Sequence, residues 1–476
     1  MSKNILIKNF SALTVMQMVQ YIAPLIVLPY LVRVIGPAKF GVVSFAHAVA
    51  YYFSLLPEIG ATLYAPREVA LIRDDARELS GFVSGILALK ILVLIMTLIL
   101  YFVLISIVPR FRSEAWVFVF SAGYIIGECF IPVWFFQGIE KMINITIGVF
   151  IIRVLALIMI FVFIRREGDY VLVPLINSVS LLVGVVFMYM IVFLREGMSL
   201  CLPGLGLLKR IMTESFPLFV SNLVKNLYAG VNIVVLGFFA SNTVVGYYSA
   251  AERLIRVGMG LINQLGNVFY PYTSRMLKVS EEKGLASIRT GFVVGMLLSI
   301  PASILVITYA ETIVNVMLGN DFKQSILPLK IMGTLFFVMG LGGILGVQVL
   351  LPLGRRLEYM MPVVGGFLLN LVLVVLLSTR LYEVGAAIAC VIAQIVVTLW
   401  TAYYIKGLGV RVLDRPVSLK LLALGLVLTA FAGFSMAAGI NTFISIIIFC
   451  LLFICLTVAL RIVDIRNLTI QSQGGR

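Results

Sequence analysis

Fourteen apolar runs follow one another along the chain, and this feature constrains its fold more than any other. They cover residues 10–32, 41–63, 81–105, 115–137, 143–164, 170–194, 214–238, 245–270, 288–310, 326–350, 359–379, 383–405, 419–437 and 442–462. A helix needs about 20 apolar residues to cross the hydrocarbon core of a bilayer. The chain is also 62% hydrophobic and only 12% charged, which excludes a soluble globular fold. We therefore predict an all-α polytopic membrane protein with about 14 transmembrane helices.

The distribution of basic residues predicts the orientation of these helices. If the N-terminus is cytoplasmic, 22 of the 36 Lys and Arg residues fall in cytoplasmic segments and eight on the opposite side. Cytoplasmic segments of membrane proteins carry such an excess. Both termini are therefore predicted to be cytoplasmic. The net charge of +15 then needs no nucleic-acid partner to explain it.

Several chemistries have no support in the sequence. The chain contains no Gly-x-x-x-x-Gly-Lys-Ser/Thr segment for binding a nucleotide. Its single His and its five Cys, which show no paired or metal-like spacing, do not resemble a metal site or a disulfide framework. We therefore expect no cofactor, no metal and no enzymatic activity.

Two pairs of similar segments indicate an internal repeat. Residues 40–47 (Phe-Gly-Val-Val-Ser-Phe-Ala-His) resemble residues 245–252, and residues 134–141 resemble residues 350–356. Six spans separate the members of each pair, so the two halves would have the same orientation in the membrane. The predicted division is an N-terminal six-helix bundle, a C-terminal six-helix bundle and two additional helices with a short cytoplasmic tail, at 1–200, 201–410 and 411–476.

Charged residues within the predicted spans are mostly basic. They are Lys90, Arg153, Lys225, Arg253, Arg256 and Lys330, whereas the acidic ones are Glu128 and Glu252, with Glu58 near the end of a span. Charges inside a membrane are costly unless they face protein or water. A positive interior suits an anionic passenger better than a cation. Lys90, Arg153 and Lys330 are expected to be interface anchors, and Glu252 with Arg256 could instead form a helix-stabilising pair.

Polar residues recur at helical spacing on the first two spans of each half. In the second span, His47, Tyr51 and Glu58 lie on one face together with Ser44 and Ser54. The corresponding residues of the other three spans are Thr14, Gln17 and Tyr21; Asn222, Lys225, Asn226 and Asn232; and Glu252, Arg256, Asn263 and Asn267. We expect these four helices to enclose a wet central cavity. Two of these residues could have structural roles instead: Lys225 could extend its ammonium group to the membrane interface, and His47 could serve in packing.

Several segments resemble Wzx-type O-antigen flippases of the multidrug/oligosaccharidyl-lipid/polysaccharide (MOP) exporter superfamily. They are Asn-Phe-Ser at 9–11, Pro-Leu-Ile-Val-Leu-Pro-Tyr-Leu-Val-Arg-Val-Ile-Gly at 24–36, Phe-Gly at 40–41, Phe-Ala at 45–46, Pro-Val-Trp-Phe-Phe-Gln-Gly-Ile-Glu at 132–140 and Gln-Val-Leu-Leu-Pro-Leu-Gly at 348–354.

The resemblance implies two six-helix bundles that open alternately to each side of the bacterial inner membrane. Its members move an undecaprenyl-pyrophosphate-linked oligosaccharide from the cytoplasmic to the periplasmic leaflet. It also implies a proton or sodium gradient as the driving force, and a polysaccharide polymerase and chain-length regulator as partners. Residues 419–437 and 442–462 resemble two helices of the lipid II flippases, where a groove can receive the lipid tail.

The residues and the resemblance together predict a substrate site. The expected substrate-binding residues are Lys225, Arg253, Arg256, His47, Arg153, Asn222, Gln17 and Tyr51, and the candidates for ion coupling are Glu58, Glu128 and Glu252. The match to the lipid II flippases is incomplete, because the first span offers only Arg33 and the second has His47 in place of an Arg.

Three other functions remain open at this point. A cation-coupled drug antiporter of the MATE type would depend on the three acidic residues. A membrane-embedded glycosyl- or acyltransferase would alter its lipid covalently. A scaffold of the polysaccharide assembly complex would transport nothing itself.

Overall fold

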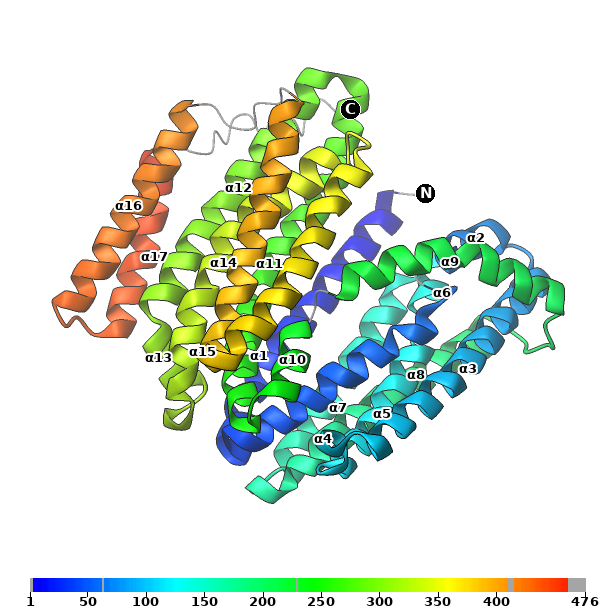
Figure 1. Cartoon of the computed structure of the whole chain (residues 1–476). Coiled ribbons are helices and arrows are strands. Elements are labelled where there is room, and N and C mark those ends of the chain that lie inside the picture. The colour runs from blue at the N-terminus through cyan, green and yellow to red at the C-terminus, as the bar shows by residue number, and fades with distance from the viewer. Residues whose placement is uncertain (1–2, 62–63, 228–229, 409–414, 461–476) are drawn as a thin grey trace. The chain divides into compact units, whose positions relative to one another are not determined.

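A computed structural model describes residues 3–61, 64–227, 230–408 and 415–460, and in these ranges the chain is helical, with no β-strand (Figure 1). The α-helices are α1 (Lys3–Ser54), α2 (Tyr64–Ile72), α3 (Ala76–Ile107), α4 (Pro109–Arg112), α5 (Ala115–Phe130), α6 (Val133–Gly138), α7 (Met142–Phe163), α8 (Leu172–Met190), α9 (Leu205–Leu227), α10 (Val231–Phe239), α11 (Asn242–Val279), α12 (Glu281–Thr308), α13 (Ala310–Met317), α14 (Ile326–Ile344), α15 (Arg356–Gly407), α16 (Arg415–Ala437) and α17 (Thr442–Ala459). Short 3-10 or π segments are η1 (Leu56–Glu58), η2 (Glu167–Val171), η3 (Ile191–Arg195), η4 (Asn320–Ser325) and η5 (Leu345–Leu350).

Ten of the described helices are long and apolar enough to cross a membrane. The prediction of an all-α polytopic membrane protein is therefore confirmed. The chain folds into two compact units, Met1–Gly246 and Tyr247–Arg476. The predicted division into two six-helix bundles and a C-terminal pair stays a prediction.

Helix α15 contains two of the predicted spans, and helix α1 contains the span 10–32 and the first part of the span 41–63. Helix α1 breaks at Gly36, whose φ of 68° and ψ of 172° are not helical. Glycine has no Cβ and adopts this conformation without strain, and Pro37 directly after it cannot donate a backbone hydrogen bond. Helix α15 breaks at Tyr382, between the spans predicted at 359–379 and 383–405.

The break at Tyr382 stores backbone strain, because its φ of 50° is unfavourable for a side chain with a Cβ. We expect Tyr382→Gly to raise the free energy of unfolding by about 1 kcal/mol. The matched control is Tyr403→Gly, which removes another exposed tyrosine from a regular part of α15. It should lower the free energy of unfolding by a similar amount. Thermal unfolding in detergent measures both, and a lower melting temperature for Tyr382→Gly would contradict the strain.

The first unit is built around α1, α5, α7 and α8, which pack on one another, while α3 packs on α5 and α9 on α3. Helix α5 ends at Phe130, two residues before Pro132, because a residue that precedes proline avoids the helical conformation. The short helix α6 follows and packs on α2. Its side chains Trp134, Phe135 and Phe136 are buried in the core of the unit.

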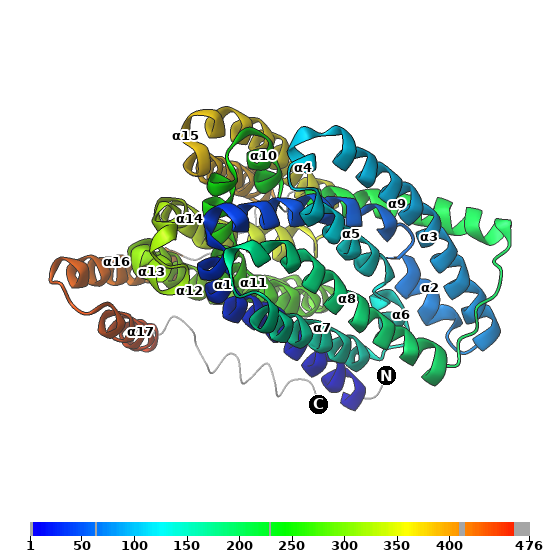
Figure 2. The same cartoon turned by 90° about the horizontal axis from the view of Figure 1, so that it is seen from below.

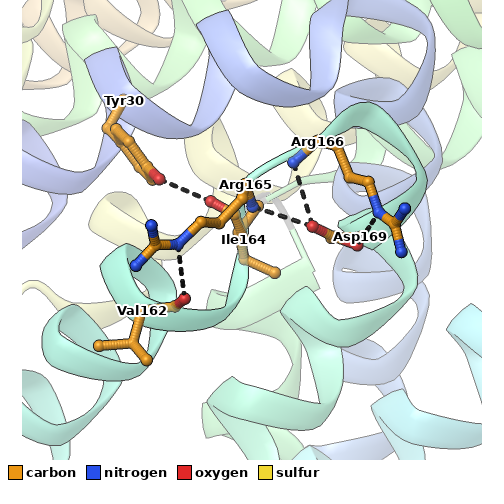
Figure 3. A network of polar contacts seen from close by, with 6 residues as sticks. All are labelled: Tyr30, Val162, Ile164, Arg165, Arg166 and Asp169. Carbon is orange, nitrogen blue, oxygen red and sulfur yellow. Dashed lines mark hydrogen bonds and ion pairs between the residues drawn. The ribbon is translucent and has the colours of Figure 1, made fainter.

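A polar network fixes the connector between α7 and α8 (Figure 3). The backbone N–H groups of Arg165 and Arg166 donate to one carboxylate oxygen of Asp169, at 2.9 and 3.0 Å. The hydroxyl of Tyr30 on α1 donates to the carbonyl of Ile164 at 2.6 Å. The connector is thereby tied both to itself and to α1.

In the second unit, α14 packs on α12 and α15, and α12 also packs on α16. Helices α16 and α17 lie side by side, which Figure 2 shows from below. Their core contains Leu424, Leu428 and Phe449. The hydroxyl of Tyr309 shares hydrogen bonds with Ser435 at 3.2 Å and Ser445 at 2.6 Å, which joins the pair to the rest of the unit.

Candidate functional site

The first unit holds a buried lysine within a transmembrane helix. Lys90 on α3 is 1% exposed, and its Nζ lies 3.3 Å from Oε1 of Glu58. The same ammonium donates to the carbonyl oxygen of Cys129 at 2.6 Å. That carbonyl lies in the last turn of α5 and has no helical partner, because the helix ends at Phe130. The end of α5 thus supplies one ligand of the ammonium and η1 supplies the other.

A second acid and a second base complete this group. Glu128 on α5 accepts a hydrogen bond from the hydroxyl of Tyr124, and it lies within electrostatic range of Glu58, Lys90 and Arg153. We call Glu58, Lys90, Glu128 and Arg153 the charged cluster. Its two carboxyl groups and two basic groups balance formally, which lowers the cost of holding them inside a membrane.

Three predicted polar residues of α1 and α9 lie close to this cluster. The ring of His47 lies 4.8 Å from that of Tyr124, centroid to centroid. The hydroxyl of Tyr51 donates to Oδ1 of Asn226 at 3.1 Å. Asn226 in turn donates to the carbonyl and to the side-chain oxygen of Asn222, at 2.8 and 3.2 Å. Helix α1 is therefore linked to α9 by hydrogen bonds and to α5 by a ring contact.

The second unit carries a different charge pattern on α11. The Nη2 of Arg256 lies 2.7 Å from Oε1 of Glu252, one helical turn away, and Arg253 lies within electrostatic range of both residues. The ion pair suggested by the spacing is therefore present. The segment from Glu252 to Arg256 thus contains two guanidinium groups and one carboxylate, which gives it a formal charge of +1.

The structure thus brings together His47, Tyr51, Glu58, Glu128, Arg153 and Asn222 in the first unit, and Glu252, Arg253 and Arg256 in the second. Gln17 lies on α1, partly buried, and its Oε1 accepts no hydrogen bond among the described residues. The side chain of Lys225 lies outside the described part of the chain.

The interpretation of Lys90 as an interface anchor is wrong, because its side chain is almost completely buried and pairs with Glu58. The position of Lys90 well inside the apolar run 81–105 could have indicated that this side chain is buried. Tyr124 and Asn226 were also missing from the predicted site. Among the described residues no group of three or more His, Cys, Asp or Glu side chains could hold a metal ion.

Comparisons with known proteins identify the family of this chain. The family described as polysaccharide biosynthesis protein matches residues 6–277. This chain belongs to that family. Over 400 residues it is 27% identical to a protein designated an O-antigen transporter in Escherichia coli (strain K12), which covers 84% of this chain and 96% of the relative. The resemblance seen in the sequence is confirmed.

Two solved structures have the same fold as this chain. The lipid II flippase MurJ in an inward closed conformation matches with a TM-score of 0.71 at 14% identity, over 96% of this chain and 99% of that one. An inward-facing multidrug resistance MATE family transporter of the MOP superfamily matches with a TM-score of 0.63 at 14% identity, over 84% and 99%. Because the identities are low, these matches establish the fold alone.

Proposed function

We propose that this chain is a flippase that moves an undecaprenyl-pyrophosphate-linked oligosaccharide, an O-antigen or related surface-polysaccharide repeat unit, from the cytoplasmic to the periplasmic leaflet by alternating access. The observation that carries the proposal is the charge of the α11 segment from Glu252 to Arg256, which contains two guanidinium groups and one carboxylate. Family membership and the relative designated an O-antigen transporter support it.

The chemistry of the substrate fits these groups. A pyrophosphate esterified at both ends is a compact dianion that loses its hydration when it enters a protein site, and guanidinium groups replace that hydration with paired hydrogen bonds. We assign this role to Arg253 and Arg256, together with Lys225. The glycan carries hydroxyl groups, and we assign their recognition to polar residues of the first unit: Gln17, His47, Tyr51, Arg153 and Asn222.

The energy source belongs to the same proposal. Moving a bulky polar head group across the hydrocarbon core repeatedly in one direction requires coupling to a gradient. We assign the binding of the coupling ion, a proton or sodium, to Glu58, Glu128 and Glu252, because carboxyl groups bind either ion. The protein would act in the bacterial inner membrane with both termini cytoplasmic, alongside a polymerase and a chain-length regulator. No covalent step is involved.

The proposal is tested by following a pyrophosphate-linked oligosaccharide in proteoliposomes that contain this protein alone. We expect the double variant Arg253→Ala/Arg256→Ala to lower the flipping rate at least about tenfold, because each lost charge-assisted hydrogen bond weakens binding by about 1.5–3 kcal/mol. The control is Arg355→Ala, since Arg355 forms a comparable ion pair with Glu358 at 3.1 Å on an exposed helix start. Full activity of the double variant would contradict the assignment.

A cation-coupled drug antiporter is the second candidate, favoured by the two carboxyl groups of the charged cluster and by the shared fold of the MATE family transporter. It predicts export of a cationic dye by the same proteoliposomes and no movement of the lipid-linked glycan. A glycosyl- or acyltransferase would instead leave a lipid of altered mass, which mass spectrometry of the recovered lipid would detect.

A further inference from the structure

An apolar groove of about 710 Å³ opens on the first unit between α3 and α8. Its α3 wall consists of Ser84, Leu87, Ala88 and Ile91, which recur at helical spacing on one face. Its α8 wall includes Val186 and Met190, both more than half exposed. The volume lies within the range of about 300–1,000 Å³ that is typical of ligand pockets. Because both helices are long and apolar enough to cross the membrane, the groove would face hydrocarbon.

The connector between η3 and α9 closes one end of the groove. Its backbone is tied to α3, because the N–H groups of Ser199 and Cys201 donate to the hydroxyls of Ser80 and Ser84, at 3.2 and 3.0 Å. Residues 200–203 of this connector line the groove. The end wall is therefore a fixed part of the fold.

This connector is unusually apolar for a segment between helices. Leu200 and Leu202 in the connector are 66% and 99% exposed, and Leu205 at the start of α9 is 84% exposed. A cluster of exposed leucines in water is unfavourable, whereas at the boundary between head groups and acyl chains it is favourable. The connector thus places the closed end of the groove at the membrane surface.

Basic side chains flank the connector at both of its ends. Arg195 precedes it and Lys209 follows it, both are exposed, and among the described residues neither forms an ion pair. The carboxylate of Glu196 is already engaged by Lys141 at 2.6 Å. Arg195 directly follows Leu194, which lines the groove, so the groove and the cations that flank the connector suit a lipid with an apolar chain and an anionic head group.

We propose that this groove holds the isoprenoid chain of a polyprenyl phosphate lipid, with its phosphate between Arg195 and Lys209. The inference rests on the proposed function, in which the substrate is such a lipid. A polyprenyl phosphate has one long apolar chain, whereas a phospholipid has two. The connector is on the side that the positive-inside rule makes cytoplasmic, which is where the substrate is loaded. The groove therefore differs from the tail site expected at residues 419–437 and 442–462.

The native thiol of Cys201 reports on the groove, because it is exposed and lines it. In a Cys450→Ser/Cys455→Ser background, the two other exposed thiols are absent. We expect undecaprenyl phosphate to slow maleimide modification of Cys201 about tenfold in nanodiscs, as the chain excludes the reagent. Phosphatidylglycerol at the same concentration should change the rate less than about twofold. Equal protection by both lipids, or none by undecaprenyl phosphate, would overturn the proposal.

Two matched substitutions on α8 locate the bound chain. Val186→Trp fills the groove and should abolish the protection of Cys201, whereas Val183→Trp changes an exposed valine outside the lining and should preserve it. Size-exclusion chromatography checks that both variants are folded. Protection that survives in Val186→Trp would overturn the groove assignment. If Cys201 is protected in a protein that does not flip the glycan, the groove proposal stands and the proposed flippase function is contradicted. If the protein flips the glycan but Cys201 is not protected, the function stands and the groove proposal is contradicted.

Discussion

Lys90→Met is expected to lower the free energy of unfolding by about 3–5 kcal/mol, because it leaves the carboxylate of Glu58 and the carbonyl of Cys129 without their buried cation. Methionine keeps most of the volume of lysine, so the loss of stability comes from the missing charge more than from changed packing. Thermal unfolding of the purified protein in detergent measures the effect.

The matched control is Lys141→Met. Lys141 pairs with Glu196 at 2.6 Å, but its side chain is 52% exposed, and an exposed pair contributes only about 0–1 kcal/mol. A further variant, Lys90→Met/Glu58→Gln, removes both partners and should recover a large part of the lost stability. Equal melting temperatures for Lys90→Met and Lys141→Met would contradict the buried pair.

The double variant also distinguishes a purely structural role of the charged cluster from a role in binding the coupling ion. If the charged cluster serves only the fold, a stable Lys90→Met/Glu58→Gln protein should flip its substrate normally. If Glu58 and Glu128 bind the coupling ion, the same protein should be folded but should no longer respond to a pH or sodium gradient. Measuring the flipping rate with and without each gradient distinguishes these two roles.

The fold was largely predictable because each span is encoded locally. Apolar length gives the helices, and the gaps between runs coincide with the breaks at Gly36 and Tyr382. The partners of Lys90 are not local. They come from η1 and α5, 32 and 39 residues away in the sequence. Spacing within one helix shows which residues share a face, but it does not show which helix that face meets.

The groove between α3 and α8 was not predictable for a related reason. The connector after η3 looks like a short link between two apolar runs. Its role depends on hydrogen bonds to Ser80 and Ser84, whose hydroxyls lie on α3 more than a hundred residues earlier. By contrast, the pairing of Glu252 with Arg256 was suggested by spacing alone, because both residues lie on one helix.

Gly41→Ala is expected to lower the free energy of unfolding by about 3 kcal/mol, since overpacking of this kind forces backbone atoms apart. The start of α11 crosses α1 at this point, and a Cβ on Gly41 would overlap the carbonyl oxygen of Asn242 and crowd the backbone of Gly246. A Cβ on Gly246 would in turn overlap the carbonyl oxygen of Pro37. These two glycines occupy corresponding positions in the repeated segments 40–47 and 245–252.

The reciprocal contact makes the prediction specific. Gly246→Ala should destabilise the protein as strongly as Gly41→Ala, and the double variant should be less harmful than the sum, because one shift of the helices relieves both overlaps. Gly266→Ala on the same α11 is the control, since its Cβ would meet no atom of the described residues within 4 Å. That substitution should stabilise the helix by about 0.5–1 kcal/mol. Similar melting temperatures for Gly41→Ala and Gly266→Ala would show that the helices do not cross at this pair.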